Sequence, residues 1–286
     1  MNIIKSTLLG LSVAAASQMA MAATTGATVA TVDPEADRIA LQEYMKNRFP
    51  DTEMSEYING IYAVDAASRA QWEEIEEFPP YELDLEKGEE LFNTPFANGK
   101  GYADCFENGG IGIRQNFPYW NDERKTVVTL EMAINECRMV NGEKPLGWKK
   151  GAIAEISAYM AYTSRGNEFA IDIPNDDAKA AYLDGKKFFY SKRGQLNLSC
   201  ADCHLTGTNR LVRADLPSPA LGHTTHFPVV RSKWGNIGTL HRRYEGCHRD
   251  SRSEYLKPQS ETFRNLEYFQ TYMSNGLIVN GPGARK

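Results

Sequence analysis

Two cysteines and a histidine stand together in the segment Cys200-Ala-Asp-Cys203-His204, which has the spacing C-x-x-C-H. In this pattern the two thiols add to the vinyl groups of a haem, and the adjacent imidazole ligates the iron. A zinc site would need a second C-x-x-C, which the sequence lacks. A thioredoxin-like redox pair would follow a βαβ pattern, whereas apolar residues before the motif, such as Tyr182 and Phe189, recur at helical spacing. The motif therefore predicts one covalently bound haem c.

Spacing alone does not choose the second axial ligand of the iron. Met273 is the only methionine after His204, but it falls in a terminal helix, whereas small cytochromes take their methionine from a loop before that helix. Cys247 is an unconventional candidate, because a thiolate pushes electron density onto the iron and lowers its potential. The conventional candidates are the four other histidines: His223, His226, His241 and His248.

Cys247 lies in the basic segment Arg242-Arg243-Tyr-Glu-Gly-Cys247-His-Arg249. The chain has five cysteines, so one is left over after two pairs are assigned. Residues 231–252 hold six lysines and arginines against two acids, a local charge of +4 in a chain of net charge −5. Neighbouring cations depress a thiol pKa and attract small anions. The alternative is a solvated basic surface with an incidental cysteine. An unpaired thiol in an oxidising compartment is, however, normally retained only where it is protected or takes part in chemistry.

The first 22 residues are predicted to be a signal peptide. Lys5 supplies a positive start, residues 8–16 form a short apolar stretch, and Ala20-Met-Ala22 is an A-x-A cleavage site. The stretch is too short to span a bilayer, which disfavours a retained anchor. We expect a mature protein that begins at Ala23 in the periplasm, where disulfides persist.

Composition excludes other classes of protein. The 286 residues are 42% hydrophobic and 24% charged, which is typical of a globular chain rather than a disordered or fibrous one. Beyond the first residues no apolar run is long enough for a membrane span. The net charge of −5 argues against nonspecific nucleic-acid binding, which needs a basic face.

The chain contains an internal repeat. The haem motif aligns with Tyr102-Ala-Asp-Cys105-Phe106, and further matches relate the two copies. These matches pair 185–189 with 88–92, 212–217 with 113–118, and, at a constant offset of 110, Cys247 with Cys137, Leu266 with Ile156 and Tyr272 with Tyr162. The first copy has Phe106 in place of the proximal histidine and Tyr102 in place of the first cysteine.

The first copy retains Cys105 and Cys137, for which we expect a disulfide. A helical unit without haem loses much of its core, and a covalent link compensates. Closing a loop of about 30 residues stabilises by roughly 3 kcal/mol. Two free buried thiols are the alternative, which an oxidising compartment disfavours.

These observations predict an all-α protein with two cytochrome c-like domains, the first of which has lost its haem. The expected boundaries are a helical extension at 23–80, a haem-less domain at 81–172 and a haem-binding domain at 173–286. In the extension, Leu41, Tyr44 and Met45 follow helical spacing between Pro34 and Pro50, and we expect this helix to wrap the first domain.

The whole mature chain resembles SoxA, the cytochrome c subunit of the SoxAX complex in bacterial thiosulfate oxidation. The resemblance rests on two cytochrome-like halves, the C-terminal C-x-x-C-H and the later R-x-x-x-C segment, Arg243 to Cys247. It implies that Cys247 is the axial ligand opposite His204, accepts sulfur and can carry a persulfide, with Arg243 binding the substrate anion beside it. Many members carry two haems, whereas this sequence is similar to the single-haem subgroup.

The resemblance also implies a reaction and its partners. The activity would be that of an L-cysteine S-thiosulfotransferase, which couples thiosulfate oxidatively to a cysteine of the carrier SoxY, itself paired with SoxZ. Electrons would pass to the cytochrome SoxX in a heterodimer. Two other functions stay open: a thiosulfate dehydrogenase that forms tetrathionate without a carrier, and a plain electron-transfer cytochrome in which Cys247 is a bystander.

Overall fold

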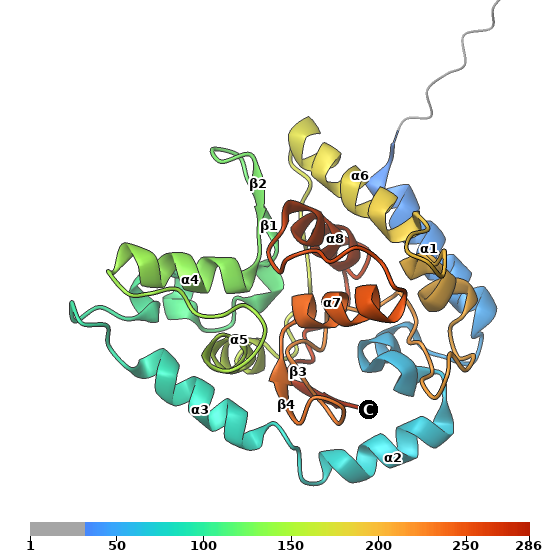
Figure 1. Ribbon diagram of the computed structural model, residues 1–286, viewed down its shortest axis with the longest axis horizontal. Helices are drawn as coiled ribbons and strands as arrows, with labels where there is room; N and C mark the ends of the chain where they lie inside the picture. The colour runs from blue at the N-terminus through green and yellow to red at the C-terminus, as the bar shows by residue number, and fades with distance from the viewer. Residues whose placement is uncertain (1–31) are drawn as a thin grey trace, which may run out of the picture. The chain divides into compact units, whose positions relative to one another are not determined.

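Helices form most of the chain, as the spacing of apolar residues predicts (Figure 1). The computed structural model describes residues 32–286, so the predicted signal peptide lies outside the described residues. No helix within this described part is both long and apolar enough to cross a membrane. Residues 81–172 are called the first half below, and residues 173–286 the second half.

Three helical segments precede the two halves: α1 (Pro34–Arg48), η1 (Met54–Ala63) and α2 (Ala66–Glu76). Pro34 begins α1, where its fixed φ suits the first turn and its missing N–H costs nothing. In Figure 1, α1 lies along α6 (Asp176–Tyr190) of the second half. There Asp37 accepts hydrogen bonds from Tyr182 at 2.9 Å and Lys186 at 2.6 Å. The expectation that this helix wraps the first half is therefore wrong.

The first half is built from α3 (Glu82–Asn93), α4 (Leu130–Val140) and α5 (Ala152–Tyr162). Short 3-10 turns lie between α3 and α4: η2 (Tyr102–Asp104), η3 (Glu107–Gly110) and η4 (Arg114–Asn116). An antiparallel hairpin of β1 (Tyr119–Asn121) and β2 (Thr126–Val128) leads into α4. Thr129 caps this helix by accepting the N–H of Met132 at 3.2 Å.

The second half has the corresponding order of elements. After α6 come the π-helical turn η5 (Asp202–Thr206), α7 (Leu240–Asp250) and α8 (Glu261–Tyr272). The strands β3 (Val229–Arg231) and β4 (Asn236–Gly238) pair antiparallel before α7, and β5 (Gly283–Arg285) lies parallel to β3. Each of these strands is short, so the chain is helical with short strands rather than strictly all-α.

The constant offset that relates Cys137 to Cys247 extends through more of the chain than the sequence matches suggested. Both strands of each hairpin, and α4 with α7, begin and end at positions related by this same offset. Residues 223–228 therefore correspond to 113–118, and the match of 113–118 to 212–217 is wrong. The additional residues of the second half lie in the loop between the C-x-x-C-H turn and β3.

A glycine brings two helices into close contact in each half. A Cβ on Gly88 of α3 would lie 2.1 Å from the Glu155 carbonyl oxygen of α5, and one on Gly185 of α6 would lie 2.0 Å from the Asn265 oxygen of α8. Only glycine permits backbones to approach this closely. Glu155 and Asn265 are again related by the offset between Cys137 and Cys247, so the same helix crossing occurs in both halves.

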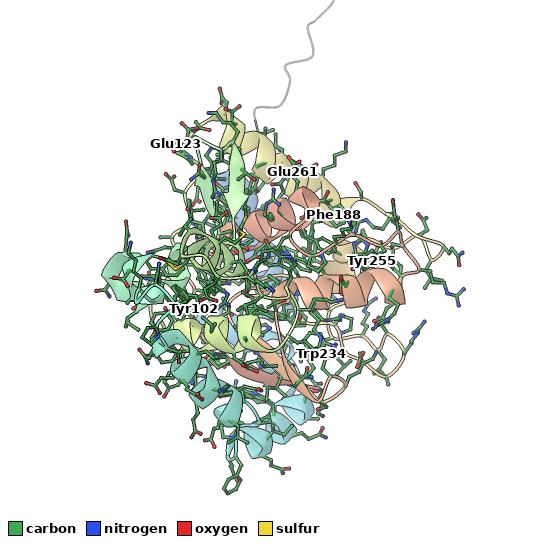
Figure 2. All side chains as sticks on the ribbon, turned by 60° about the vertical axis from the view of Figure 1, so that its left-hand side comes forward. Tyr102, Glu123, Phe188, Trp234, Tyr255 and Glu261 are labelled. Atoms are coloured by element: carbon green, nitrogen blue, oxygen red, sulfur yellow. A yellow bond between two sulfur atoms is a disulfide. The ribbon has the colours of Figure 1, made fainter. Side chains whose placement is uncertain are left out.

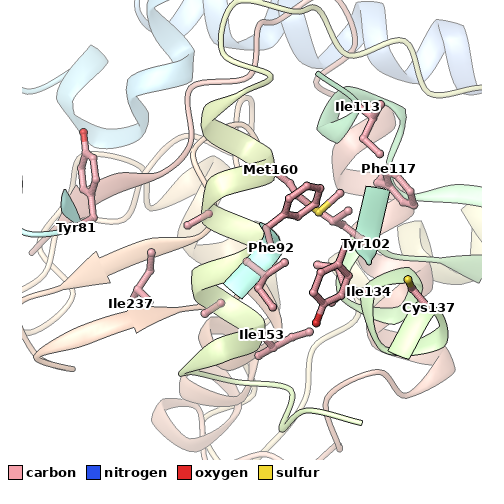
Figure 3. Packing of buried hydrophobic residues seen from close by; sticks show 14 of the residues in the cluster. Tyr81, Phe92, Tyr102, Ile113, Phe117, Ile134, Cys137, Ile153, Met160 and Ile237 are labelled. Atoms are coloured by element: carbon pink, nitrogen blue, oxygen red, sulfur yellow. The ribbon is translucent and has the colours of Figure 1, made fainter. Parts of the chain in front are cut away.

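The two halves share buried contacts rather than packing as separate bodies. The hairpin strand β2 of the first half contacts α6 and α8 of the second, while β4 of the second half contacts α5 of the first. One continuous apolar cluster accordingly joins Phe92, Tyr102 and Met160 to Ile237 of β4 (Figure 3). The helix α7, which carries Arg243 and Cys247, therefore belongs to a scaffold built from both halves.

Candidate functional site

The C-x-x-C-H motif occupies a tight helical turn that begins at Cys200. The carboxylate of Asp202 anchors this turn by accepting the N–H of Ser199 at 2.8 Å and the Ser199 hydroxyl at 2.9 Å. The backbone hydrogen bond lowers the pKa of Asp202, so the anchor is charged at neutral pH. Cys200 and Cys203 are both free, half-buried thiols on this turn.

His204 faces the loop that follows the motif. Its Nδ1 lies 2.8 Å from the carbonyl oxygen of Ser218. Burial lowers the pKa of His204 to about 4, so its imidazole is neutral. A neutral ring that donates Nδ1–H to a carbonyl keeps the Nε2 lone pair for a metal. With two free thiols on the same turn, the donor set fits a covalently attached haem c.

The helix α7 carries Arg243 and Cys247 one turn apart, so the two side chains share a face. Burial and the nearby Cys247 sulfur together raise the pKa of Cys200 to about 11. The same two causes raise the pKa of Cys203, whereas the charge of Arg243 lowers it. Because such influences weaken with distance, Cys247 lies near both thiols of the motif and Arg243 lies near Cys203.

The side chain of Arg243 makes no hydrogen bond or ion pair with the residues between 32 and 286. Its Nη1 lies 3.4 Å from the point that a Cβ on Gly246 would occupy, so the guanidinium lies along α7 beside Gly246, the residue before Cys247. The adjacent Arg242 is engaged: it lies over the ring of Trp234, which Figure 2 labels, 4.2 Å from the ring centroid, and it donates to Asn236 at 2.5 Å. Of these two arginines, Arg243 is the one left to bind an anion.

Two of the conventional ligand candidates are committed to other contacts. Met273 is 3% exposed, and its sulfur lies 3.6 Å from the Tyr182 hydroxyl, whose proton Asp37 accepts, in the packing of α6 against α8. His241 accepts the N–H of Gln259 at 2.9 Å through Nδ1 and places Nε2 3.1 Å from Glu267. Neither side chain is therefore available to an iron held at His204.

The remaining histidines are distributed around the site. His223 lies 2.9 Å from Nδ1 of His204, on the edge of that ring remote from Nε2, so it is on the wrong side to be the opposite axial ligand. His248 stacks on Phe188 with centroids 5.6 Å apart, and its Nδ1 lies 2.9 Å from the Glu254 carbonyl. His226 is buried, 6% exposed, in the loop before β3.

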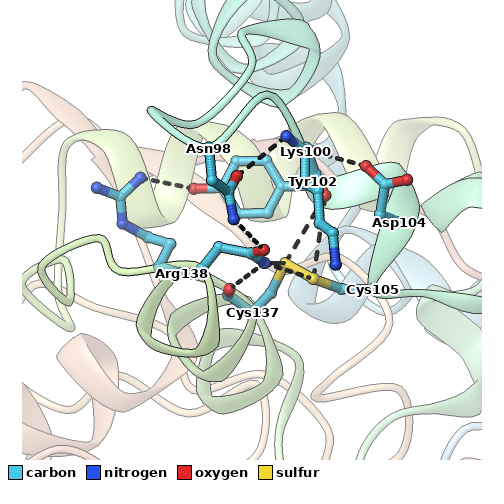
Figure 4. The surroundings of a disulfide bond; sticks show 9 residues. Asn98, Lys100, Tyr102, Asp104, Cys105, Cys137 and Arg138 are labelled. Atoms are coloured by element: carbon cyan, nitrogen blue, oxygen red, sulfur yellow. Dashed lines mark hydrogen bonds between the residues drawn. A yellow bond between two sulfur atoms is a disulfide. The ribbon is translucent and has the colours of Figure 1, made fainter.

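In the first half, the positions that align with the motif hold a tyrosine, a disulfide-bonded cysteine and a phenylalanine. Tyr102 is 1% exposed and packs against Phe92, with ring centroids 5.7 Å apart, so it fills core volume. Cys105 and Cys137 form a disulfide with Cα atoms 5.7 Å apart (Figure 4). The disulfide joins the two cysteines that the sequence predicts. Cys137, which corresponds to Cys247, is therefore not a free thiol.

Some contributors to the site carry no signal in the sequence. The Ser218 carbonyl that binds His204 is a backbone atom, and a backbone atom has no residue-type signature. Gln270 contacts His223, and Tyr244 contacts Gln270. Both lie on helices whose apolar spacing would account for them as ordinary core residues. Only the packing of α7 on α8 reveals their relation to the motif.

Comparison with known proteins places this geometry in a family. Residues 87–169, in the half without C-x-x-C-H, match the SoxA/TsdA cytochrome c domain family. The protein named L-cysteine S-thiosulfotransferase subunit SoxA from Chlorobaculum tepidum is 58% identical over 252 residues, covering 88% of each chain. The protein of that name from Allochromatium vinosum is 53% identical over 260 residues, covering 90% of this chain and 92% of the relative.

A solved structure agrees with the sequence relatives. The crystal structure of SoxXA from P. pantotrophus aligns with a TM-score of 0.69 at 27% identity, covering 78% of this chain and 84% of that chain. The fold is therefore that of the cytochrome c proteins, and its cofactor is haem c. Within that class, the chain belongs to the SoxA family of L-cysteine S-thiosulfotransferase subunits.

Proposed function

We propose that the second half, 173–286, holds one haem c, attached through Cys200 and Cys203 and ligated by His204 and Cys247. The first half, 81–172, is a cytochrome c-like domain from an internal duplication that has lost its haem, and 23–80 is an extension. Free donors at one motif, against a buried tyrosine and a disulfide at the other, support this division.

The reaction we propose is the oxidative coupling of thiosulfate to a cysteine of the carrier protein SoxY, which acts with SoxZ. A sulfur–sulfur bond forms between the carrier sulfur and the outer sulfur of thiosulfate, the thiol proton goes to solvent, and two electrons leave. Haem c supplies an exit for electrons when bound, and the partner cytochrome SoxX receives them. The names of the relatives and the solved SoxXA complex support this assignment.

The residues of α7 have separate roles in this reaction. Cys247 is the sulfur acceptor and can carry a persulfide. Arg243 binds the sulfonate oxygens of thiosulfate, for which its planar fork is suited. Burial and the charge of Arg243 lower the pKa of the nearby Arg231, so a second cation contributes to the field that attracts a dianion.

The periplasm is the compartment that fits this reaction. The predicted signal peptide leads there, and an oxidising compartment preserves the disulfide between Cys105 and Cys137. In a reducing compartment the disulfide would not persist.

The observation that carries the proposal is the free Cys247 near the motif thiols, with Arg243 unpaired one helical turn away. The test uses the holoprotein with SoxX, SoxYZ and thiosulfate, and the mass of the carrier is the readout. We expect a thiosulfonate adduct on the carrier with the unaltered protein, and none with Cys247→Ala, whose haem stays attached through Cys200 and Cys203.

Two outcomes would contradict this function. Tetrathionate formation without SoxYZ would show a thiosulfate dehydrogenase. Unchanged spectrum and turnover in Cys247→Ala would show that a histidine is the ligand, that the thiol is a bystander, and that the protein is an electron-transfer cytochrome.

A further inference from the structure

A second histidine contacts the side of the His204 ring that carries Nδ1. His223 Nε2 lies 2.9 Å from His204 Nδ1 and 3.1 Å from the Ser218 hydroxyl. The two imidazoles meet edge to face, with centroids 4.1 Å apart. His204 Nδ1 therefore has two neighbours, although the Ser218 carbonyl alone would satisfy its single hydrogen.

His223 is itself held by a hydrogen-bonded series that leads to α7. Gln270 of α8 places Nε2 2.8 Å from His223 Nδ1, and the Tyr244 hydroxyl of α7 donates to Gln270 Oε1. Gln270 is 3% exposed and Tyr244 is 7% exposed, so solvent does not compete for these bonds. Tyr244 precedes Cys247 by three residues and shares its face of the helix.

We propose that His223 is a positioning residue, which fixes the orientation of the His204 imidazole and, through Gln270 and Tyr244, couples it to the helix that carries Cys247. This inference rests on the proposed ligation of haem iron by His204. It connects one proposed ligand, His204, with the helix that carries the other, Cys247, through one buried series, Tyr244–Gln270–His223–His204. The series reaches His204 at Nδ1, not at Nε2.

The hydrogens in this series can be ordered in two directions. As described, Gln270 donates to His223 Nδ1, so the His223 proton lies on Nε2 and faces the Ser218 hydroxyl. When His204 binds metal through Nε2, its proton lies on Nδ1, where the Ser218 carbonyl and His223 Nε2 accept it. The Gln270 amide then turns over, exchanging the positions of its oxygen and nitrogen, to accept from His223 Nδ1–H and to donate to Tyr244.

An acceptor on Nδ1–H makes a ligating imidazole more basic, which favours the oxidised metal. His223 should therefore lower the reduction potential of the haem, and it should also fix the plane of the His204 ring. Removing His223 has two separate consequences: the midpoint potential rises, and the distribution of axial ring orientations broadens.

The test uses the oxidised holoprotein and compares His223→Phe with His223→Gln. Phenylalanine keeps a ring of similar volume without nitrogen, whereas glutamine returns an amide near the position of Nε2. We expect His223→Phe to shift the reduction equilibrium about tenfold, which is about 59 mV upward for one electron, and to shift or broaden the electron paramagnetic resonance g-values. His223→Gln should restore most of both.

Tyr244→Phe provides a second, milder variant that removes one hydroxyl from the far end of the series. It should raise the midpoint potential by less than His223→Phe does. The matched control is Tyr255→Phe, an exposed tyrosine that donates to Glu245 beyond the series, and it should leave both readouts unchanged.

Failure of the inference can be separated from failure of the proposed ligation. If His204→Ala keeps the g-values of the unaltered protein, His204 is not the ligand and the proposed haem site is wrong. If His204→Ala changes the g-values while His223→Phe leaves both readouts unchanged, the positioning role of His223 is overturned. Should His223→Phe fail to fold, an unchanged midpoint potential in Tyr244→Phe overturns it.

Discussion

The two halves use the same helical elements in different ways. Their hairpins and the helices α4 and α7 coincide at one constant offset along the chain, and a glycine permits the same helix crossing in each. At equivalent positions, however, Cys137 is joined to Cys105, whereas Cys247 is free and lies near the thiols of the C-x-x-C-H turn. The comparison shows that one position on this scaffold can serve either covalent stabilisation or chemistry, depending on what lies opposite.

Buried polar pairs differ between the halves in a related way. In the first half the Ser157 hydroxyl donates to Glu131 at 2.9 Å. At the corresponding positions of the second half, Glu267 lies 3.1 Å from His241. Arg114 of the first half is 3.8 Å from Glu267 and connects the two pairs. The scaffold thus tolerates different charges at matched sites, provided that they are compensated across the boundary.

The largest expected effects come from the equivalent cysteines. Cys247→Ala should abolish carrier-dependent thiosulfate oxidation and change the haem spectrum, with little change in the free energy of unfolding. Replacing both Cys105 and Cys137 by alanine should instead cost about 3 kcal/mol of that free energy, because the closed loop is released. Its haem spectrum should stay native. Urea unfolding and absorption spectra of the two variants measure this contrast. A changed haem spectrum in the double variant would show that the disulfide of the first half also affects the haem site.

The glycine crossings test whether haem binding depends on the second half alone. Gly88→Ala and Gly185→Ala each introduce a Cβ about 2 Å from a backbone oxygen, so each should destabilise the protein by about 3 kcal/mol. Only Gly185→Ala should also lower the haem content per chain, measured as pyridine haemochrome. Equal haem loss in both variants would contradict a haem-less first half.

Adjacent arginines on α7 offer a matched pair. Arg243→Ala should weaken thiosulfate turnover by about 10- to 150-fold, since a hydrogen bond to a charged group contributes about 1.5–3 kcal/mol. Arg242→Ala removes the same charge from a side chain that is already engaged with Trp234 and Asn236, and should change turnover far less. Steady-state rates at several thiosulfate concentrations compare them, and equal losses would assign the effect to net charge rather than to Arg243.

The smallest expected effect concerns the boundary between the halves. Burial, reinforced by the charge of Glu267, raises the pKa of Glu131 above its usual value. The folded state then holds this proton more tightly than the unfolded state, so its contribution is present below about pH 4.5 and is lost as pH rises through the folded pKa. In Glu131→Gln, the free energy of unfolding should therefore fall less as the pH rises from about 4.5 through the folded pKa of Glu131.

Urea unfolding of Glu131→Gln at a series of pH values, from below 4.5 to 8, provides the measurement. The control is Glu136→Gln on the same helix, whose carboxylate pairs with Arg124 at a more exposed site. If the free energy of unfolding has the same pH dependence in the two variants, the Glu131 proton does not stabilise the contact between the halves.

The residues of the candidate site could be proposed from the sequence because they lie close together in the chain. C-x-x-C-H places two thiols and an imidazole within one short motif, and the R-x-x-x-C spacing places Arg243 and Cys247 on one face of any helix. The N-terminal helix was also predictable, with α1 beginning at Pro34 and ending before Pro50. Its position against α6 was not, because the partner of Asp37 depends on chain packing rather than on periodicity.

By itself, the sequence determined the covalent chemistry: which cysteines share a motif, which pair remains, and which thiol is left over. Residue type and short spacing fix these properties whatever the fold. Only the tertiary structure decided which face α7 presents to the motif, which histidines are committed elsewhere, and that His223 stands behind His204. Those relations join residues that are far apart in the chain, and their distances are set by helix crossings and shared core packing, which a linear pattern does not contain.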